Sequence, residues 1–154
     1  MLLKEDTLSY YKKNIQNFVK NTINADMKFN QRKFLDRFTE FGRILDFGCR
    51  CGPDVKVFLD LGYEVEAVDG CRELCEMAAA YVGIPVRQMD FLELDARERY
   101  DGIWACASIL HLPYEEIKAV MKKMAAALKE NGVVYVSFKY GEFEGWRNGR
   151  YFTD

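Results

Sequence analysis

A short glycine-containing segment, ILDFGCRCGPDV at residues 44–55, restricts the folds open to this chain. An apolar run that includes Asp46 leads into a turn with Gly48 and Gly52, and Pro53 follows directly. Proline is favoured at the first position of a helix, because the amide hydrogen that it lacks has no intrahelical partner there. The segment therefore predicts a strand, a tight turn and a helix start, an arrangement that places a nucleotide-type ligand at the carboxyl end of a strand.

Beyond this segment, apolar runs alternate with helical patterns. Runs of this kind, separated by helices, are typical of a parallel sheet that is covered on both faces. We therefore predict an α/β fold with a doubly wound, mainly parallel sheet. Gly132 is expected to end the last helix. The expected strands are 44–47, 64–68, 85–88, 101–106 and 133–138, and the expected helices between them are 53–61, 72–82 and 114–130.

Two helices are expected before the first strand. The second covers residues 30–38, with Asn30 as its N-cap. We treat the chain as one domain, made of N-terminal helices (1–41), a strand–helix core (42–138) and a C-terminal segment (139–154). The first helix is indicated by residues at helical spacing, namely Tyr11, Ile15, Phe18, Val19 and Thr22.

Composition excludes several classes of protein. The 154 residues are 49% hydrophobic and 30% charged, as in an ordinary soluble domain. The formal net charge is −2 and no basic run occurs, so a nucleic-acid surface is not expected. No apolar stretch approaches the roughly 20 residues that span a bilayer. The N-terminus lacks the pattern of a secretion signal, and we expect a cytoplasmic protein.

The five cysteines admit two interpretations. Cys49 and Cys51, together with Cys71 and Cys75, suggest a zinc site if the two loops lie side by side. Neither spacing is the usual Cys-x2-Cys, and the only histidine is distant in the sequence. We favour reduced, buried thiols and expect no metal site.

The chain resembles the class I S-adenosylmethionine-dependent methyltransferases, whose first motif reads Asp/Glu-x-Gly-x-Gly-x-Gly. Asp46, Gly48 and Gly52 match it, whereas Arg50 stands in place of the middle glycine. If the backbone is left-handed at this position, a non-glycine residue costs about 1–2 kcal/mol. The Arg50 side chain is expected to enter the cofactor pocket, to point outward, or to pair with the cofactor's carboxylate. Further stretches resemble small-molecule methyltransferases of the tellurite-resistance type, namely AVDG at 67–70, DFLELD at 90–95, YDGIWACASILHLP at 100–113 and GRYFTD at 149–154.

This resemblance implies a set of cofactor contacts. Asp69, which lies 21 residues after Gly48 and precedes Gly70, would accept hydrogen bonds from both ribose hydroxyls. Asp90 and Phe91 would meet the adenine. The resemblance also places the loop residues Asp46, Gly48, Cys49 and Gly52 against the cofactor, with Ala107 near the methyl group and Tyr11 within reach.

Nicotinamide dinucleotides are the alternative ligand. Their Gly-x-Gly-x-x-Gly motif also requires an acidic residue about 20 positions later. Starting at Gly48, this motif would need glycines in place of Arg50 and Pro53. The sequence therefore favours S-adenosylmethionine as the cofactor.

The methyl acceptor is expected to be a small molecule. The fourth strand lacks the Asn/Asp-Pro-Pro-Tyr tetrad of many amino-methylating enzymes, which disfavours nucleobase or glutamine methylation. His111 is the only histidine and the candidate catalytic residue, or else a hydrogen-bonded histidine at a helix entrance. Tyr140, Arg147 and Arg150 follow the fifth strand, where related enzymes shape the acceptor pocket; surface packing is the other interpretation.

The resemblance also implies that the usual last two strands of the sheet are missing. The apolar strand 133–138 would then form an exposed edge. We expect residues 139–154 to cover this edge, or a second copy of the chain to do so in a homodimer. A non-catalytic cofactor-binding or assembly module on the same fold is the alternative to an active enzyme.

Overall fold

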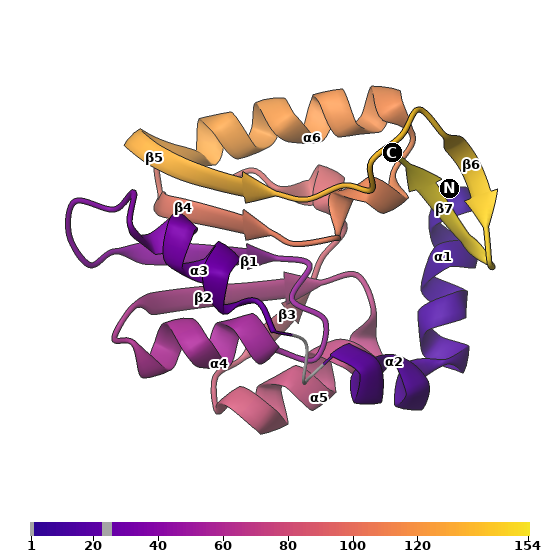
Figure 1. Cartoon of the computed structure of the whole chain (residues 1–154), viewed down its shortest axis with the longest axis horizontal. Helices are drawn as coiled ribbons and strands as arrows, with labels where there is room; N and C mark the ends of the chain where they lie inside the picture. Colours follow the sequence, from indigo (N-terminus) through magenta and orange to yellow (C-terminus); the bar gives the residue numbers. More distant parts are fainter. Residues whose placement is uncertain (1, 23–25) are drawn as a thin grey trace.

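The computed structural model of this protein describes residues 2–22 and 26–154. Its strands are β1 (Arg43–Phe47), β2 (Glu64–Asp69), β3 (Val86–Gln88), β4 (Tyr100–Ala105) and β5 (Leu128–Val136). They form one parallel sheet in the order β3-β2-β1-β4-β5 (Figure 1). The strand order reverses between β1 and β4, and the carboxyl ends of the strands leave a crevice at such a reversal.

Helices cover both faces of this sheet. They are α1 (Leu2–Lys13), α2 (Ile15–Thr22), α3 (Lys28–Leu35), α4 (Pro53–Asp60), α5 (Arg72–Val82) and α6 (Tyr114–Ala127), with two short 3-10 helices, η1 (Phe91–Glu93) and η2 (Ile109–His111). Helix α6 lies on one face, and α4 and α5 lie on the other (Figure 1). The predicted α/β fold with a doubly wound parallel sheet is confirmed. Within residues 2–22 and 26–154, no helix is long and apolar enough to cross a membrane.

The alternation of side chains along each strand produces two cores. On one face, Leu45, Phe47 and Ile103 pack with Val120 and Met124 of α6. Neighbouring residues of the same strands point to the opposite face and pack against α3 and α4. The central strands are therefore buried on both sides, which explains their nearly continuous apolar sequence.

Trp104 of β4 is the centre of the second core. Its ring stacks on Tyr135 of β5, with the ring centroids 4.0 Å apart. Phe34 and Phe58 meet the same indole at centroid distances of 5.3 and 5.4 Å. This aromatic cluster holds α3 and α4 on the sheet, next to the strand that carries the glycine turn.

The N-terminal helices differ from the prediction in their boundaries. The expected first helix is divided at Asn14 into α1 and α2, and the side chain of Thr22 lies outside the described residues. Helix α3 begins at Lys28, and Met27 occupies its N-cap without a side-chain hydrogen bond. Asn30 is therefore not the N-cap, since it lies inside the first turn of the helix.

The predicted end of the last helix at Gly132 was also wrong. Helix α6 ends at Ala127, and Leu128 already has the extended backbone with which β5 begins. Leu128 pairs with Tyr100 of β4, and the register then shifts before Gly102. Pairing with the neighbouring strand thus ends the helix earlier than its periodicity indicates.

Residues after β5 form a separate two-stranded antiparallel sheet. Its strands, β6 (Glu144–Arg147) and β7 (Arg150–Thr153), pair with each other and not with the main sheet. Strand β7 packs against α1 and η2 (Figure 1). The main sheet therefore ends at β5, as predicted, and the separate β6–β7 hairpin is an additional element that the sequence analysis did not predict. Residues 139–154 do not extend the sheet beyond β5, and a homodimer through that edge stays a prediction.

The packing of α3 leads to a stability prediction. Phe34→Ala should lower the free energy of unfolding by about 3–5 kcal/mol, because it opens a cavity beside Trp104. Phe29→Ala in the same helix should change it by less than about 0.5 kcal/mol, since Phe29 is 70% exposed whereas Phe34 is 3% exposed. Urea denaturation of both variants measures the difference. Equal losses would contradict the described orientation of α3.

Candidate functional site

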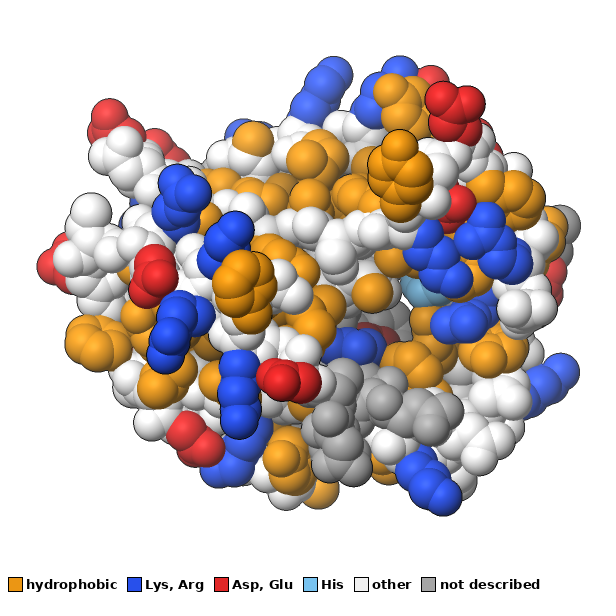
Figure 2. All heavy atoms as spheres, viewed as in Figure 1, with side chains coloured by type: hydrophobic (Ala, Val, Ile, Leu, Met, Phe, Trp, Pro, Cys, Tyr) orange, Lys and Arg blue, Asp and Glu red, His pale blue; other side chains and the backbone are white. Residues whose placement is uncertain are grey.

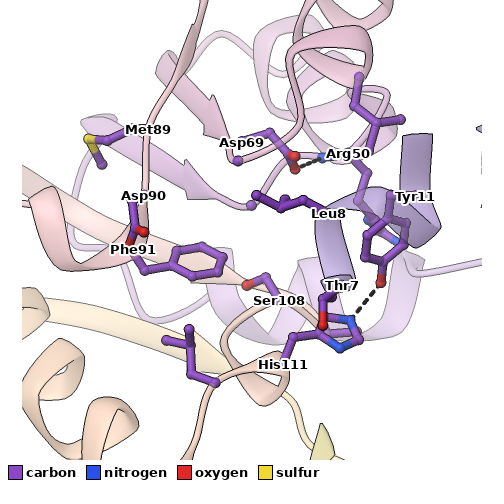
Figure 3. A pocket seen from close by; sticks show the side chains of 15 residues that line it. Thr7, Leu8, Tyr11, Arg50, Asp69, Met89, Asp90, Phe91, Ser108 and His111 are labelled. Carbon is purple, nitrogen blue, oxygen red and sulfur yellow. Dashed lines mark hydrogen bonds between the residues drawn. The ribbon is translucent and has the colours of Figure 1, made fainter. Parts of the chain in front are cut away.

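A pocket lies at the carboxyl ends of the central strands, where the strand order reverses. It encloses about 650 Å³ with its open mouth included, which is within the usual range of ligand pockets. Figure 3 shows its side chains from close by. The lining residues are Thr7, Leu8, Tyr11, Gly48, Arg50, Asp69, Gly70, Leu74, Met89, Asp90, Phe91, Ala107, Ser108, His111 and Leu112.

The turn after β1 reaches the pocket through Gly48. Its φ of +94° lies in the left-handed region, which glycine adopts at no steric cost. A Cβ at this position would collide with the Cβ of Ser108, whose hydroxyl donates to the carbonyl of Phe47 over 2.7 Å. Glycine therefore lets the turn after β1 pack against the loop after β4.

Asp69 at the end of β2 presents its carboxylate to the same space. One oxygen accepts from the backbone amide of Arg50 over 2.9 Å (Figure 3). The other oxygen accepts from the backbone amide of Cys71, also over 2.9 Å. Burial raises the pKa of this carboxyl to about 6. Each carboxylate oxygen can accept a further hydrogen bond, so Asp69 is held in place with acceptor capacity left.

Arg50 adopts the left-handed backbone that the motif requires, with a φ of 57°. Its side chain pairs with Asp54 in the first turn of α4, where Nη2 lies 3.2 Å from Oδ2. Asp54 also accepts from Gln31 over 2.6 Å and from the indole of Trp104 over 3.0 Å. One guanidinium nitrogen is thus held by Asp54, while Arg50 also lines the pocket and its buried Nε has no hydrogen-bond partner within residues 2–22 and 26–154. The side chain therefore does not point outward, and pairing with a cofactor carboxylate stays a prediction.

Asp90 and Phe91 follow β3 on the opposite wall. The Asp90 carboxylate accepts from the amide of Leu92 over 2.9 Å and caps η1, together with Glu93. The Phe91 ring lines the pocket and packs on Phe47, with the ring centroids 4.8 Å apart. This short capped turn therefore fixes a flat apolar surface beside an acidic group.

Helix α1 closes the remaining side through Thr7, Leu8 and Tyr11. A Cβ added to Gly70 would lie 3.1 Å from Leu8, which shows how closely α1 approaches the end of β2. Thr7 accepts from the backbone amide of Tyr151 in β7 over 3.2 Å. Helix α1 therefore forms this wall of the pocket, and β7 at the other end of the chain supports it.

His111, the last residue of η2, contacts both α1 and β7. Its Nδ1 lies 2.8 Å from the carbonyl of Tyr151; because a carbonyl only accepts, Nδ1 carries the hydrogen and Nε2 is the acceptor. Nε2 then accepts from the hydroxyl of Tyr11 over 2.6 Å (Figure 3). Burial, together with a smaller effect of the nearby cations Arg150 and Lys139, lowers the pKa of His111 to about 4. The imidazole is therefore neutral at pH 7.

The structure brings most of the predicted site residues to the pocket. Three others do not line the pocket. Cys49 is buried in the glycine turn, and Gly52 is the N-cap of α4. Asp46 is buried too, and its Oδ2 has no hydrogen-bond partner within residues 2–22 and 26–154. Burial raises the pKa of Asp46 well above its usual range. The predicted residues that line the pocket are Gly48, Asp69, Gly70, Asp90, Phe91, Ala107 and His111.

The three residues predicted to shape the acceptor pocket, Tyr140, Arg147 and Arg150, lie outside the lining. Tyr140 is fully exposed, and Arg147 forms an ion pair with Asp154 over 3.0 Å. Sequence reasoning missed the contributions of α1 other than Tyr11, because a helical pattern does not say what the helix packs against. It also missed Met89 and Ser108, which directly precede Asp90 and follow Ala107.

The cysteines form no metal site in the described part of the chain. All five thiols are free and buried, and no group of three or more potential ligands lies close enough to hold an ion. Burial raises the pKa of Cys71 to about 11 and that of Cys75 to about 12, so both are neutral thiols at pH 7.

Comparison with known families identifies what this pocket belongs to. A family model described as a methyltransferase domain matches residues 15–145, a stretch that includes all five strands of the main sheet. The chain belongs to this methyltransferase family. A comparison with curated proteins found no match.

Solved structures share the fold of this methyltransferase. A DhpI-SAH complex matches 99% of this chain and 80% of its own, with a TM-score of 0.75 and 19% identity. A second match is the 1,6-didemethyltoxoflavin-N1-methyltransferase of Burkholderia thailandensis, with 1,6-didemethyltoxoflavin and S-adenosylhomocysteine bound. It covers 97% of this chain and 68% of its own, with a TM-score of 0.74 and 22% identity. The PH0226 protein of Pyrococcus horikoshii matches 75% of this chain, with a TM-score of 0.63 and 22% identity. This chain spans only 57% of that protein. These likenesses establish the class I fold.

The binding of Arg50 to Asp54 leads to a second stability prediction. Asp54→Ala should cost about 3–5 kcal/mol of unfolding free energy, because it leaves the Arg50 charge and two further donors without their acceptor. Asp60→Ala, which removes the exposed ion pair with Lys56 in the same helix, should cost less than about 1 kcal/mol. Urea denaturation compares the two variants. A cost for Asp54→Ala no larger than that for Asp60→Ala would refute the structural role of this contact.

Proposed function

We propose that this protein is an S-adenosylmethionine-dependent methyltransferase that acts on a small molecule. The family match and the class I fold support an enzyme of this type. One structure with this fold holds SAH, and another holds S-adenosylhomocysteine together with 1,6-didemethyltoxoflavin. The observation that carries the proposal is the Asp69 carboxylate, which is fixed by two backbone amides and still has acceptor capacity in the pocket.

The residues present fit S-adenosylmethionine. Asp69 would accept from the ribose hydroxyls, which require acceptors about 3 Å away. Phe91 offers an apolar face for the adenine, next to the Asp90 acid. Gly48 and Gly70 leave backbone without side chains at the pocket surface, where the cofactor must approach closely. Arg50 keeps its side chain on Asp54, so its presence in the motif is compatible with this arrangement.

The cofactor, when bound, supplies a methyl group on a sulfonium that is already a good leaving group. The protein then has to hold and align the acceptor, which makes the reaction effectively unimolecular. Tyr11 and Leu8 of α1 would exclude water from the pocket. With a pKa of about 4, His111 is a weak base, so acceptors that are nucleophilic without losing a proton suit this site best.

The role of Asp69 can be tested by replacement. Asp69→Ala should weaken the binding of S-adenosylhomocysteine about 10-fold to 100-fold, since a hydrogen bond to a charged acceptor contributes about 1.5–3 kcal/mol. Glu64→Gln, at the other end of β2, should leave the affinity unchanged. Isothermal titration calorimetry measures the affinity of both variants for S-adenosylhomocysteine, and circular dichroism confirms that they are folded. Unchanged affinity in folded Asp69→Ala would remove Asp69 from the site.

Cofactor affinity should also depend on pH. The ionised Asp69 carboxylate accepts from hydroxyls, whereas the protonated form has lost acceptor capacity, so ligand binding favours the ionised form. Because the carboxyl has a pKa of about 6, affinity should be constant above pH 7 and fall about tenfold per pH unit below 6. Calorimetry between pH 8 and pH 5 measures this. The Asp69→Ala variant should show no such change, and an equally steep fall in that variant would assign the titration to another group.

Turnover is tested by the release of S-adenosylhomocysteine from S-adenosylmethionine in the presence of small-molecule acceptors. Release that depends on one acceptor class supports the proposed enzyme. Cofactor binding without release on a broad panel would favour the non-catalytic module instead. The resemblance to the tellurite-resistance type, the cytoplasmic location, the lack of nucleic-acid binding and the homodimer stay predictions.

A further inference from the structure

Three basic side chains surround the ring of Phe152 in β7. The Lys139 ammonium lies 4.3 Å from the ring centroid, and the guanidinium carbons of Arg150 and Arg147 lie 5.1 and 5.5 Å from it. The ring itself is 3% exposed. We call Lys139, Arg147 and Arg150 the cation cluster. Three like charges around one ring repel one another, so the arrangement is costly unless negative charge compensates it.

The protein compensates only part of this charge. Arg147 is paired with Asp154 over 3.0 Å. In the described part of the chain, no carboxylate lies within 4 Å of Arg150 or Lys139, and the Nε of Arg150 is buried without a hydrogen-bond partner. Arg150 also stacks on Tyr10, with its guanidinium carbon 4.6 Å from the ring centroid. The aromatic rings thus hold a partly buried cation whose donors are not all used.

The cation cluster lies beside the pocket. The Phe152 ring packs on the imidazole of His111, with the centroids 4.8 Å apart. Arg150 Nη1 lies 3.4 Å from the hydroxyl of Tyr11; both His111 and Tyr11 belong to the pocket lining. Figure 2 shows basic side chains gathered around a hollow that exposes the pale-blue histidine, the single histidine of the chain. Asp69 lies on another wall of the pocket (Figure 3).

We propose that the methyl acceptor carries an anionic oxygen group, a carboxylate or a phosphate, which Arg150 and Lys139 bind beside His111. The inference rests on the proposed function and adds the chemical class of its substrate. Arginine presents parallel N–H donors that match the oxygens of either group, and lysine adds a point charge. An anion at this position neutralises the charges of Arg150 and Lys139, which have no carboxylate partner in the described part of the chain. Leu112, the apolar lining residue next to His111, would contact the rest of the acceptor.

The test uses three aryl probes of similar size, namely phenyl phosphate, benzoate and the neutral benzamide. Calorimetry first measures S-adenosylhomocysteine binding to the wild type and to Arg150→Gln, Lys139→Gln and Lys122→Gln. Lys122 is an exposed residue of α6 outside the cation cluster and serves as the charge-matched control. Each probe is then titrated into both free and S-adenosylhomocysteine-saturated protein.

We expect the two anions to bind at least about 10-fold more tightly than benzamide. Arg150→Gln and Lys139→Gln should each weaken the anions about 10-fold without changing benzamide or S-adenosylhomocysteine binding. Lys122→Gln should resemble the wild type. Because Lys139 is exposed, its variant keeps the test valid even if Arg150→Gln folds poorly. Phenyl phosphate and benzoate together distinguish a phosphate preference from a carboxylate preference.

The imidazole NMR signals of His111 locate the bound probe, since the chain has one histidine. Both anions should shift these signals and benzamide should not. Equal binding of benzamide, unchanged anion affinity in both cluster variants, or anion binding that leaves the His111 signals in place would overturn the proposal. Loss of S-adenosylhomocysteine affinity in Arg150→Gln would assign the cluster to the cofactor and overturn it as well. Failure of the wild type to bind S-adenosylhomocysteine would refute the proposed function instead, while the titrations of free protein still decide the anion site.

Discussion

The buried carboxylate of Asp54 ties the glycine turn to the rest of the molecule. It receives donors from three separate places, namely Gln31 of α3, Trp104 of β4 and Arg50 of the turn. A carboxylate that is 3% exposed is tolerable only with such partners. Because the donors come from a helix, a strand of the sheet and the turn itself, this single group fixes the position of the turn relative to the sheet and to α3.

This contact also explains how the motif accommodates an arginine. A left-handed non-glycine residue carries a backbone cost of about 1–2 kcal/mol. Here the same residue supplies the cation that Asp54 requires, and its own backbone amide holds Asp69. The departure from the glycine pattern is therefore compensated locally, by a carboxylate four residues later in the first turn of the helix.

The sequence was informative where function depends on local spacing. The strand ends at Asp69 and at Asp90 are set by apolar runs and by turn residues next to them, and both side chains lie in the pocket. Each of these predictions needed only a few consecutive residues, and the parallel arrangement of the strands then brought them together.

The remaining features depend on contacts between distant residues. Nothing near Leu8 or Tyr11 in the sequence indicates that α1 packs over the end of β2. The end of α6 at Ala127 is decided by pairing with β4, and the position of the β6–β7 hairpin is decided by its contacts with α1 and η2. Tyr140 is a prediction that failed for the same reason. Its position after β5 suggested that it lines the pocket, whereas its side chain is fully exposed.

The contact between Thr7 and Tyr151 has a consequence for how the molecule assembles. The two residues are 144 positions apart, and the entropy lost on closing a loop grows with its length. The parallel sheet involves shorter separations between neighbouring strands, such as β1 and β2, and is expected to form first. A chain emerging during synthesis would therefore have its strands and their acidic ends in place while one wall of the pocket is still absent. The pocket would be enclosed only when α1 and β7 meet, as one of the last events of folding.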